Sequence, residues 1–188
     1  MQVFIIASLT ANGYLADTSN VSAKSTTWTS PEDLKFFVKK TKSAGVIVMG
    51  SHTYRTIGHP LKDRLNLIYT RHPSQITNSQ PLPTDHRPLP TNIPYTTSLP
   101  PDQLVNQLTS HYQSVAICGG SQIYSLFLAA GVVDTLFLTI EPILFGQGIP
   151  FINSPMTQKL ELKTTIPLSA QTLLLEYRVI KPYKSPMV

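Results

Sequence analysis

The sequence predicts a single α/β domain built on a mixed β-sheet that is parallel in its early part. Its 188 residues are enough for one domain, and 41% of them are hydrophobic, which supports a packed core. Short apolar runs alternate with helical segments through most of the chain, a pattern typical of strand–helix–strand units with parallel strands. Two strand-like runs close the chain, at 160–166 and 172–180, and predict a terminal hairpin.

The first 72 residues predict three buried strands and two helices. The first strand ends before a turn at Asn12-Gly13, and residues 16–27 have no periodicity and predict a loop. The first helix has Ser30 as its N-cap and Pro31 as its first residue, followed by two acids. The expected ranges are 3–9, 46–49 and 65–69 for the strands, and 31–43 and 51–57 for the helices.

Eight prolines lie between residues 73 and 101. Such a density excludes a regular helix and leaves room for short edge strands at most. We interpret about 73–101 as an extended surface insertion within one domain that spans 1–188. Beyond it, helices are expected at 102–112 and 121–130, and strands at 114–118 and 135–140.

Charge and cysteine content exclude several classes of protein. The net charge of +5 is local, because residues 24–71 hold nine Lys or Arg against three acids, which favours an anionic ligand. The basic residues are scattered, so no nucleic-acid partner is expected. One cysteine and unpatterned histidines give no disulfide framework and no metal site. No apolar run approaches the ~18 residues that span a membrane, so we expect a soluble cytoplasmic protein.

Two strand–glycine–helix junctions are candidates for binding phosphate. They are Gly50-Ser51-His52-Thr53 and Gly119-Gly120-Ser121-Gln122. Glycine lets the backbone approach an anion, and a helix N-terminus offers unpaired N–H groups. Two such junctions in one sheet could hold the two ends of a pyrophosphate; the alternative is that each glycine only makes a tight turn. Neither matches the Rossmann or P-loop pattern.

Asp33 is the candidate acid. As the third residue after Ser30 it fits a capping box, in which its carboxylate accepts from the Ser30 N–H. It also lies at the margin of an apolar helical stripe (Leu34, Phe37, Val38, Thr41), where a carboxylate could bind or protonate a nitrogen heterocycle. Trp28, five residues upstream, could cover the same cleft. Cys118 ends a strand and is interpreted as core or pocket wall rather than a nucleophile.

Three blocks of sequence together resemble bacterial dihydrofolate reductase. They are Trp-Thr-Ser-Pro-Glu-Asp-Leu-Lys-Phe-Phe (28–37), Val-Met-Gly-Ser-His-Thr-Tyr-Arg-Thr-Ile-Gly-His-Pro-Leu-Lys-Asp-Arg-Leu-Asn (48–66) and Cys-Gly-Gly-Ser-Gln-Ile-Tyr (118–124). The blocks follow the family's order and spacing and, with the first strand, cover most of 1–72 and 114–141. The resemblance implies a three-layer dihydrofolate-reductase-like fold, with helices on both faces of the sheet.

The resemblance also implies NADPH-dependent reduction of 7,8-dihydrofolate to tetrahydrofolate, with hydride transfer to pterin C6. Asp33 would assist protonation of N5, Trp28 would order a water, and Thr139 would fix the carboxylate. Arg64 would clamp the glutamate carboxylate. The residues implied for the substrate are Ile6, Ala7, Asp33, Leu34, Phe37, Ile57, Leu61, Arg64, Cys118, Tyr124 and Thr139. Those implied for the cofactor are Ala7, Leu15, Gly50, Ser51, His52, Thr53, Thr70, Arg71, His72, Cys118, Gly119, Gly120, Ser121, Gln122, Ile123 and Tyr124.

Some segments depart from this family. The 16–27 loop lacks its Met-Pro, and Ser51 stands where many members have arginine, which leaves Arg71 as the main contact for the 2′-phosphate. Residues 131–134 and 144–151 look more like the reductase domain of riboflavin synthesis, which reduces a ribosylamino-pyrimidine phosphate with NADPH. That enzyme is the alternative, and a nucleotide-binding protein without turnover is a third. We expect a monomer, and inhibitors of the methotrexate or trimethoprim type are implied ligands.

Overall fold

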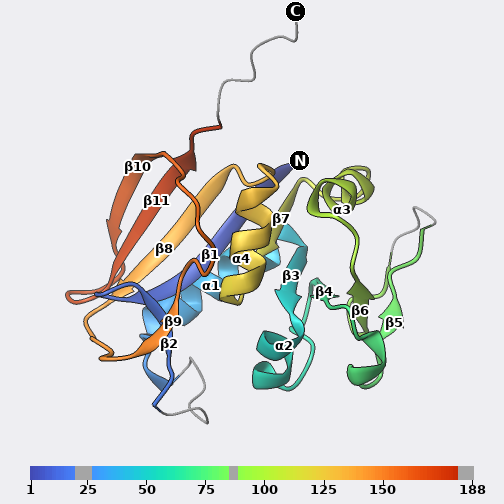
Figure 1. Cartoon of the computed structure of the whole chain (residues 1–188), viewed down its shortest axis with the longest axis horizontal. Coiled ribbons are helices and arrows are strands. Elements are labelled where there is room, and N and C mark those ends of the chain that lie inside the picture. The colour runs from blue at the N-terminus through green and yellow to red at the C-terminus, as the bar shows by residue number, and fades with distance from the viewer. Residues whose placement is uncertain (20–26, 85–88, 182–188) are drawn as a thin grey trace, which may run out of the picture.

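The computed structural model describes residues 1–19, 27–84 and 89–181. Its main feature is a nine-stranded sheet with the order β10-β11-β8-β1-β7-β3-β4-β6-β5 (Figure 1). The strands are β1 (Gln2–Thr10), β3 (Val46–Gly50), β4 (Leu65–Tyr69), β5 (Gln80–Pro81), β6 (Pro94–Thr97), β7 (Ser114–Ile117), β8 (Thr135–Glu141), β10 (Leu160–Pro167) and β11 (Leu173–Val179). The helices are α1 (Pro31–Ala44), α2 (Ser51–Ile57), α3 (Pro101–Leu108) and α4 (Ser121–Ala129).

The sheet is mixed and mostly parallel, as predicted. All pairings from β8 through β1, β7, β3, β4 and β6 to β5 are parallel. Strand β11, in contrast, pairs antiparallel with both β8 and β10. The C-terminal hairpin therefore extends one edge of the sheet beyond β8 (Figure 1). Parallel pairing brings the carboxyl ends of β1, β7, β3 and β4 to one edge, where α/β folds place their ligands.

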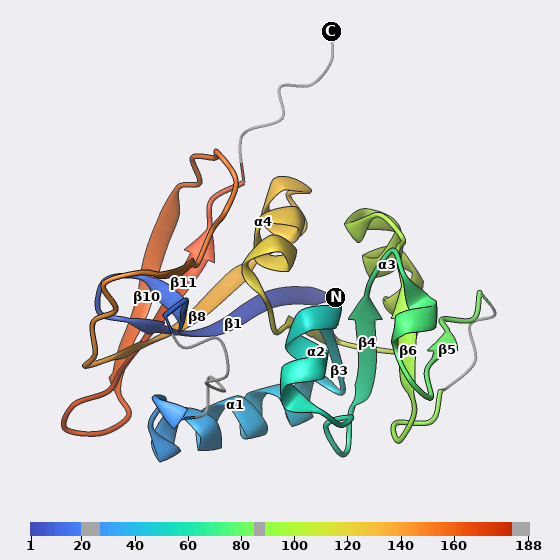
Figure 2. The same ribbon diagram turned by 60° about the horizontal axis from the view of Figure 1, so that its bottom comes forward.

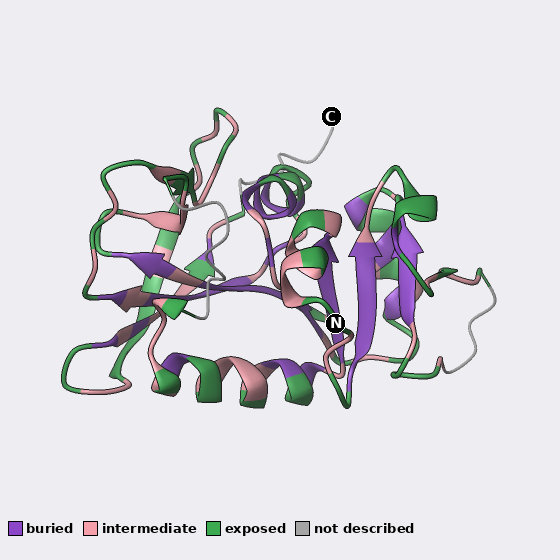
Figure 3. Ribbon diagram, turned by 90° about the horizontal axis from the view of Figure 1, so that it is seen from below, coloured by how far each residue is buried: buried purple, intermediate pink, exposed green. Residues whose placement is uncertain are grey.

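Helices cover both faces of the sheet, which gives the three layers that were expected. Along β1, Val3, Ile5 and Ala7 belong to a buried cluster with residues of α3 and α4. The alternate residues Phe4 and Ile6 belong to a second cluster, with residues of α1 and α2. Figures 2 and 3 show α1 and α4 on opposite sides of the sheet. No helix within the described ranges is long and apolar enough to cross a membrane.

Local signals explain the bounds of α1. The Ser30 hydroxyl accepts a hydrogen bond from the backbone N–H of Asp33 at 3.2 Å, and Pro31 is the first helical residue. The helix ends at Gly45, whose φ of 75° is left-handed. Its buried residues are Asp33, Thr41 and Ala44, so the face toward the sheet carries two polar side chains.

Residues 16 and 17, expected as the start of a loop, belong to a strand instead. This strand, β2 (Tyr14–Asp17), pairs antiparallel with β9 (Gly148–Pro150) in a separate two-stranded sheet. The prediction missed both strands because they are short and lie more than a hundred residues apart in the chain. Most of the predicted loop, residues 20–26, lies outside the described residues.

The proline-rich stretch contributes more than the expected edge strands. After a short 3₁₀ helix, η2 (Pro73–Gln75), it supplies β5 at the sheet edge and β6 inside it. All four residues of β6 are buried, so the interpretation of this part as surface is wrong. Pro94 opens β6, where a missing N–H is tolerated. Helix α3 begins one residue earlier and ends four residues earlier than predicted.

Candidate functional site

The two glycine junctions lie side by side at the carboxyl edge of the sheet. The N–H of Gly50 donates to the carbonyl of Gly119 at 2.7 Å, and the N–H of Cys118 donates to the carbonyl of Val48 at 2.8 Å. The Gly119–Gly120 peptide bond is cis. Gly50 also pairs with Tyr69 across β3 and β4, so the chain leaves both strands at the same edge, into α2 and toward Thr70. The structure thus brings together three of the segments that the sequence suggested for a nucleotide.

Both helices that leave these junctions start without a side-chain cap. The N-caps are Gly50 for α2 and Gly120 for α4, and neither has a side-chain oxygen that could accept from the first N–H groups of the helix. A Cβ at Gly50 would lie 3.1 Å from Cγ1 of Ile123, and one at Gly119 would lie 3.0 Å from the Tyr124 hydroxyl. A side chain at either position would therefore crowd a neighbouring residue, and with glycine the N–H groups remain available to an anion.

The other residues predicted for the cofactor differ in exposure. Arg71, His72, His52 and Gln122 are exposed, and the N–H of His72 donates to the Thr70 hydroxyl at 3.0 Å. Ser51 and Thr53 are half-buried in the first turn of α2. The Ser121 hydroxyl donates to the carbonyl of Pro150 at 2.6 Å, so its hydrogen bond stabilises the fold.

Asp33 is buried on the sheet-facing side of α1 and is only 6% exposed. The Ser8 hydroxyl donates to its Oδ2 at 2.5 Å. Burial raises the pKa of Asp33, hydrogen bonds from Ser8 and Thr139 lower it, and the charge of Glu141 raises it again, with a net upward shift. The structure thus places Thr139 of β8 behind the acid.

Only half of the predicted capping box forms. The Ser30 hydroxyl accepts from the Asp33 N–H, as expected. The Ser30 N–H, however, donates to Oε1 of Glu141 at 2.8 Å and not to Asp33. The Asp33 carboxylate therefore points to the sheet and not to its own helix terminus.

An apolar group lies along the same face of α1. Phe37, Ile57, Leu61 and Cys118 pack against the cluster that contains Ile6. Burial raises the pKa of the Cys118 thiol to about 12, so this side chain is a protonated wall residue. Leu34, beside Asp33, is 48% exposed.

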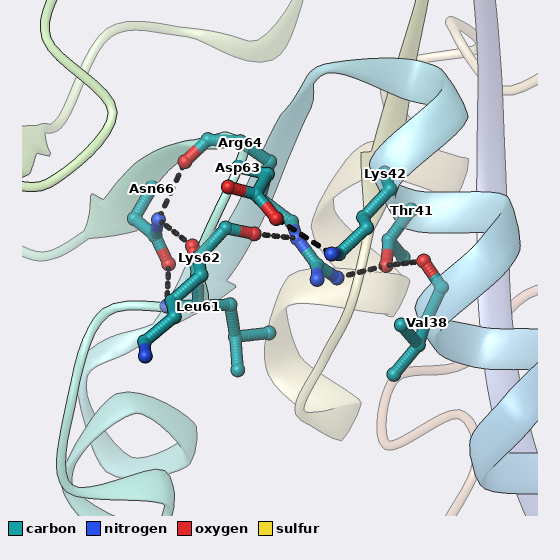
Figure 4. A network of polar contacts seen from close by, with 8 residues as sticks. All are labelled: Val38, Thr41, Lys42, Leu61, Lys62, Asp63, Arg64 and Asn66. Carbon is teal, nitrogen blue, oxygen red and sulfur yellow. Dashed lines mark hydrogen bonds and ion pairs between the residues drawn. The ribbon is translucent and has the colours of Figure 1, made fainter.

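Arg64 is only 3% exposed. It lies between the loop at Lys62 and Thr41 of α1 (Figure 4). Its Nε donates to the carbonyl of Lys62 at 2.9 Å, and its Nη1 donates to the Thr41 hydroxyl. No carboxylate of the described residues lies within ion-pair distance of it; neighbouring Asp63 pairs with Lys42 at 2.6 Å. Asp63 acts on Arg64 only at longer range, and a buried guanidinium without a directly paired carboxylate favours an anionic ligand.

Asn66 fixes the loop that carries Leu61 and Arg64. It is fully buried in β4, where its Oδ1 accepts from the Leu61 N–H at 2.8 Å. Its Nδ2 donates to the carbonyls of Leu61 and Arg64 at 2.9 and 2.8 Å (Figure 4). Asn66, Ser8 and Glu141 were not predicted as site residues, and Thr41 was predicted only as part of the apolar stripe of the helix. For Asn66 and Ser8 the available signal was a polar residue within an apolar run, whereas Thr41 lies between two lysines.

The residues predicted beside the nicotinamide belong to the other face of the sheet. Ala7 and Tyr124 are buried, and Leu15 is partly buried, in the cluster under α4, which also holds Ile123. The Tyr124 hydroxyl donates to the carbonyl of Ile6 at 2.8 Å, and burial raises its pKa well above the usual value. Trp28 packs edge-on against Phe145, with ring centroids 5.4 Å apart.

A separate cavity of about 590 Å³ lies between the end of α2 and the residues around 75–78 and 92–94. None of the predicted site residues lines it. In the described part of the chain, no three His, Cys, Asp or Glu side chains come close enough to hold a metal ion.

Solved structures similar to this chain fall into two groups. A pyrimidine reductase-like protein from Corynebacterium diphtheriae has a TM-score of 0.73 at 18% identity, over 96% of this chain and 92% of that one. A diaminohydroxyphosphoribosylaminopyrimidine deaminase/5-amino-6-(5-phosphoribosylamino)uracil reductase from Thermotoga maritima has a TM-score of 0.72 at 17% identity, over 95% and 56%. Dihydrofolate reductase from Enterococcus faecalis, complexed with NADP(H), has a TM-score of 0.62 at 17% identity, over 95% and 96%.

These identities show a shared fold. A search of curated protein sequences finds no match. The family model of dihydrofolate reductase, however, matches residues 14–142, which include Asp33, Arg64 and both glycine junctions. The chain therefore belongs to the dihydrofolate reductase family.

Proposed function

We propose that this chain reduces 7,8-dihydrofolate to tetrahydrofolate with NADPH. The observation that carries the proposal is an acid, an apolar wall and a buried cation in series. Asp33, Phe37 and Thr41 follow one another at four-residue spacing on one face of α1, so Asp33 and Thr41 lie about 12 Å apart along the helix. Thr41 in turn holds Arg64.

This series suits a long ligand with a nitrogen heterocycle at one end and a carboxylate at the other. The Asp33 carboxyl group would bind the amidine-like edge of the pterin, and Arg64 would bind the glutamate. Phe37, Ile57 and Leu61 form an apolar group that suits the benzoyl ring between them. The hydroxyl-rich ribosyl chain of the alternative substrate would find few polar partners along this wall.

Asp33 is suited to proton chemistry at the pterin. Its raised pKa makes the protonated form more available near neutral pH than for an exposed aspartate. In this proposal Asp33 favours protonation of N5 through water, Thr139 fixes the carboxyl group, and Trp28 shields the site.

The residues at the carboxyl edge of the sheet fit NADPH. The first N–H groups of α4 and α2, which no side chain caps, would hold the pyrophosphate. Thr70, Arg71 and His72, which follow the Tyr69 that pairs with Gly50, would hold the 2′-phosphate. When bound, NADPH supplies the hydride, and the chain positions the two ligands and excludes water.

The second candidate is reduction of a ribosylamino-pyrimidine phosphate, as in riboflavin synthesis. The segment 144–151 favours it, because that part of the sequence resembles the riboflavin reductase domain and contains β9. Arg64 could bind a phosphate as well as a carboxylate. A protein that binds NADPH without turnover is the third candidate.

Measuring NADPH oxidation with each of the two substrates in parallel tests the proposal. We expect a higher kcat/KM for dihydrofolate. The variant Leu61→Asn should raise KM for dihydrofolate about tenfold, since it removes apolar contact worth about 1.4 kcal/mol. The matched control Leu162→Asn, on exposed β10, should leave KM unchanged. A higher kcat/KM for the ribosylamino-pyrimidine phosphate would replace the proposal with the second candidate.

A further inference from the structure

Glu141 is a second buried carboxylate near the acid, and nothing in the proposed reaction uses it. It ends β8, is 2% exposed, and lies opposite Thr10 of β1. Its Oε1 accepts from the N–H and the hydroxyl of Ser30 at 2.8 and 2.9 Å. Its Oε2 accepts from the Thr172 hydroxyl at 3.1 Å. One side chain thus connects β8, the start of α1 and the residue before β11.

These bonds replace half of a capping box. In that motif, the side chain of the third helical residue accepts from the N–H of the N-cap residue. Here the third residue is Asp33 and the N-cap is Ser30, but Glu141 accepts from the Ser30 N–H. The Asp33 carboxylate is therefore released from its own helix and binds Ser8 on the sheet.

The Ser30 hydroxyl connects Glu141 to the first turn of the helix. It donates to Glu141 and accepts from the Asp33 N–H, so the direction of its proton is fixed by the carboxylate. Without Glu141, the Ser30 N–H loses its acceptor, and the nearest side chain with the right spacing to replace it is Asp33.

We propose that Glu141 is a positioning residue for Asp33: it takes the place of Asp33 at the N-terminus of α1 and holds that carboxyl group toward the substrate site. The part of this inference that concerns turnover rests on the proposed function. The part that concerns the position and titration of Asp33 does not.

The charge of Glu141 also affects the pKa of Asp33, which can be measured independently of turnover. Two strands carry the groups that act on the pKa of Asp33: β1 with Ser8, and β8 with Thr139 and Glu141. Besides burial, the charge of Asp33 raises the pKa of Tyr124, which lies on α4 at the other face of the sheet. Tyr124 is a neutral phenol near neutral pH, since burial raises its pKa. Glu141 is then the charge that acts on Asp33, and as a like charge it raises the pKa of the acid.

Carbon-13 NMR of the aspartate carboxyl groups tests the proposal without any substrate. The chain has six aspartates, and the signal that Asp33→Asn removes identifies Asp33. In Glu141→Gln, which keeps an acceptor for the Ser30 N–H, the Asp33 signal should titrate at lower pH than in the wild type. The control Glu161→Gln removes an exposed carboxylate on β10 and should leave that midpoint unchanged.

Turnover rates of two variants separate the effect of the Glu141 charge from its effect on the position of Asp33. Glu141→Gln should retain the limiting rate at low pH and lose about tenfold in rate at high pH for each unit by which the midpoint falls. Glu141→Ala should also lower the limiting rate by about 10²-fold, the effect of a misplaced catalytic group. An unchanged limiting rate in Glu141→Ala would overturn the positioning role, and an unchanged Asp33 midpoint in Glu141→Gln would overturn the effect of the Glu141 charge. A failure of all variants and of the wild type to turn over dihydrofolate, with the midpoint shifted, would reject only the proposed function.

Discussion

The carboxyl group of Asp33 makes the stability of this fold depend on pH. Burial raises its pKa in the folded state above the unfolded value. An acid of this kind contributes most to stability when it is protonated, below the unfolded pKa. That contribution is lost as the pH rises through the folded pKa.

We therefore predict that Asp33→Asn is more stable than the wild type at neutral pH, and that the advantage disappears at pH values below the unfolded pKa. The gain should be about 1.4 kcal/mol for each unit by which the folded pKa is raised. Urea unfolding at several pH values measures it.

Asp17→Asn is the control with the opposite sign. Hydrogen bonds from Ser19 lower the pKa of Asp17, so its variant should lose stability relative to the wild type as the pH rises. If the difference in unfolding free energy between Asp33→Asn and the wild type is the same at all pH values, the carboxyl group is not desolvated.

At the cofactor end, Arg71→Ala should weaken NADPH binding much more than NADH binding. Arg71 is exposed just beyond β4 and is the candidate partner of the 2′-phosphate, which only NADPH carries. Loss of a charge-assisted contact predicts a change of about 10- to 100-fold in Kd for NADPH, measured by fluorescence titration. Arg178→Ala, on β11, should change neither Kd. Equal losses for both cofactors in Arg71→Ala would place the 2′-phosphate elsewhere.

At the scale of elements, the β7–α4 junction depends on Gly119. Its φ is +105°, and an added Cβ would lie 3.0 Å from the buried Tyr124 hydroxyl. We predict that Gly119→Ala destabilises the fold by about 1–3 kcal/mol in denaturant unfolding. The control is Gly131→Ala, where φ is +67° and no atom lies within 4 Å, so only the backbone conformation contributes. Equal losses in the two variants would mean that Tyr124 moves aside.

Elements with signals in their own sequence were predicted closely. Ser30, Pro31 and Gly45 encode the ends of α1, and α2 begins and ends where Gly50 and Gly58 predict. The buried strands β3 and β4 were predicted to within one residue, because β-branched and aliphatic runs between glycines and turns have few alternatives.

Elements that depend on distant partners were not predicted. Strands β2 and β9 acquire their conformation from each other, and β6 is buried because β4 and β5 lie on either side of it. The site shows the same division. Asp33 and Thr139 were candidates, whereas the bond from Ser30 to Glu141 joins residues 111 positions apart, which no local pattern indicates.

For the whole molecule, the sheet edges bear on the prediction of a monomer. Strand β10 is an open edge with half-exposed Leu160, Leu162 and Ile166. A register shift between Leu162 and Thr164, the charge of Lys163 and Pro167 at its end all interrupt pairing with another strand. The opposite edge, β5, has two residues.

We predict a monomer in light scattering at all concentrations. A mass that doubles with concentration would contradict this, and loss of the doubling in Leu162→Lys would locate the contact on β10.

In the whole molecule, the proposed substrate site lies on one face of the sheet and the proposed cofactor site lies at one edge. The acid, the apolar wall and Arg64 lie on the face of α1 and α2, while the glycine junctions that would hold the cofactor open at the carboxyl edge. Asp33 is the residue on which this account depends.

The most direct test is NADPH oxidation by the purified chain with dihydrofolate, compared with Asp33→Asn. We predict turnover in the wild type, a loss of about 10²- to 10⁴-fold in kcat at neutral pH in the variant, and unchanged NADPH affinity. A wild type that binds NADPH but does not oxidise it with dihydrofolate, or a variant as active as the wild type, would contradict the account.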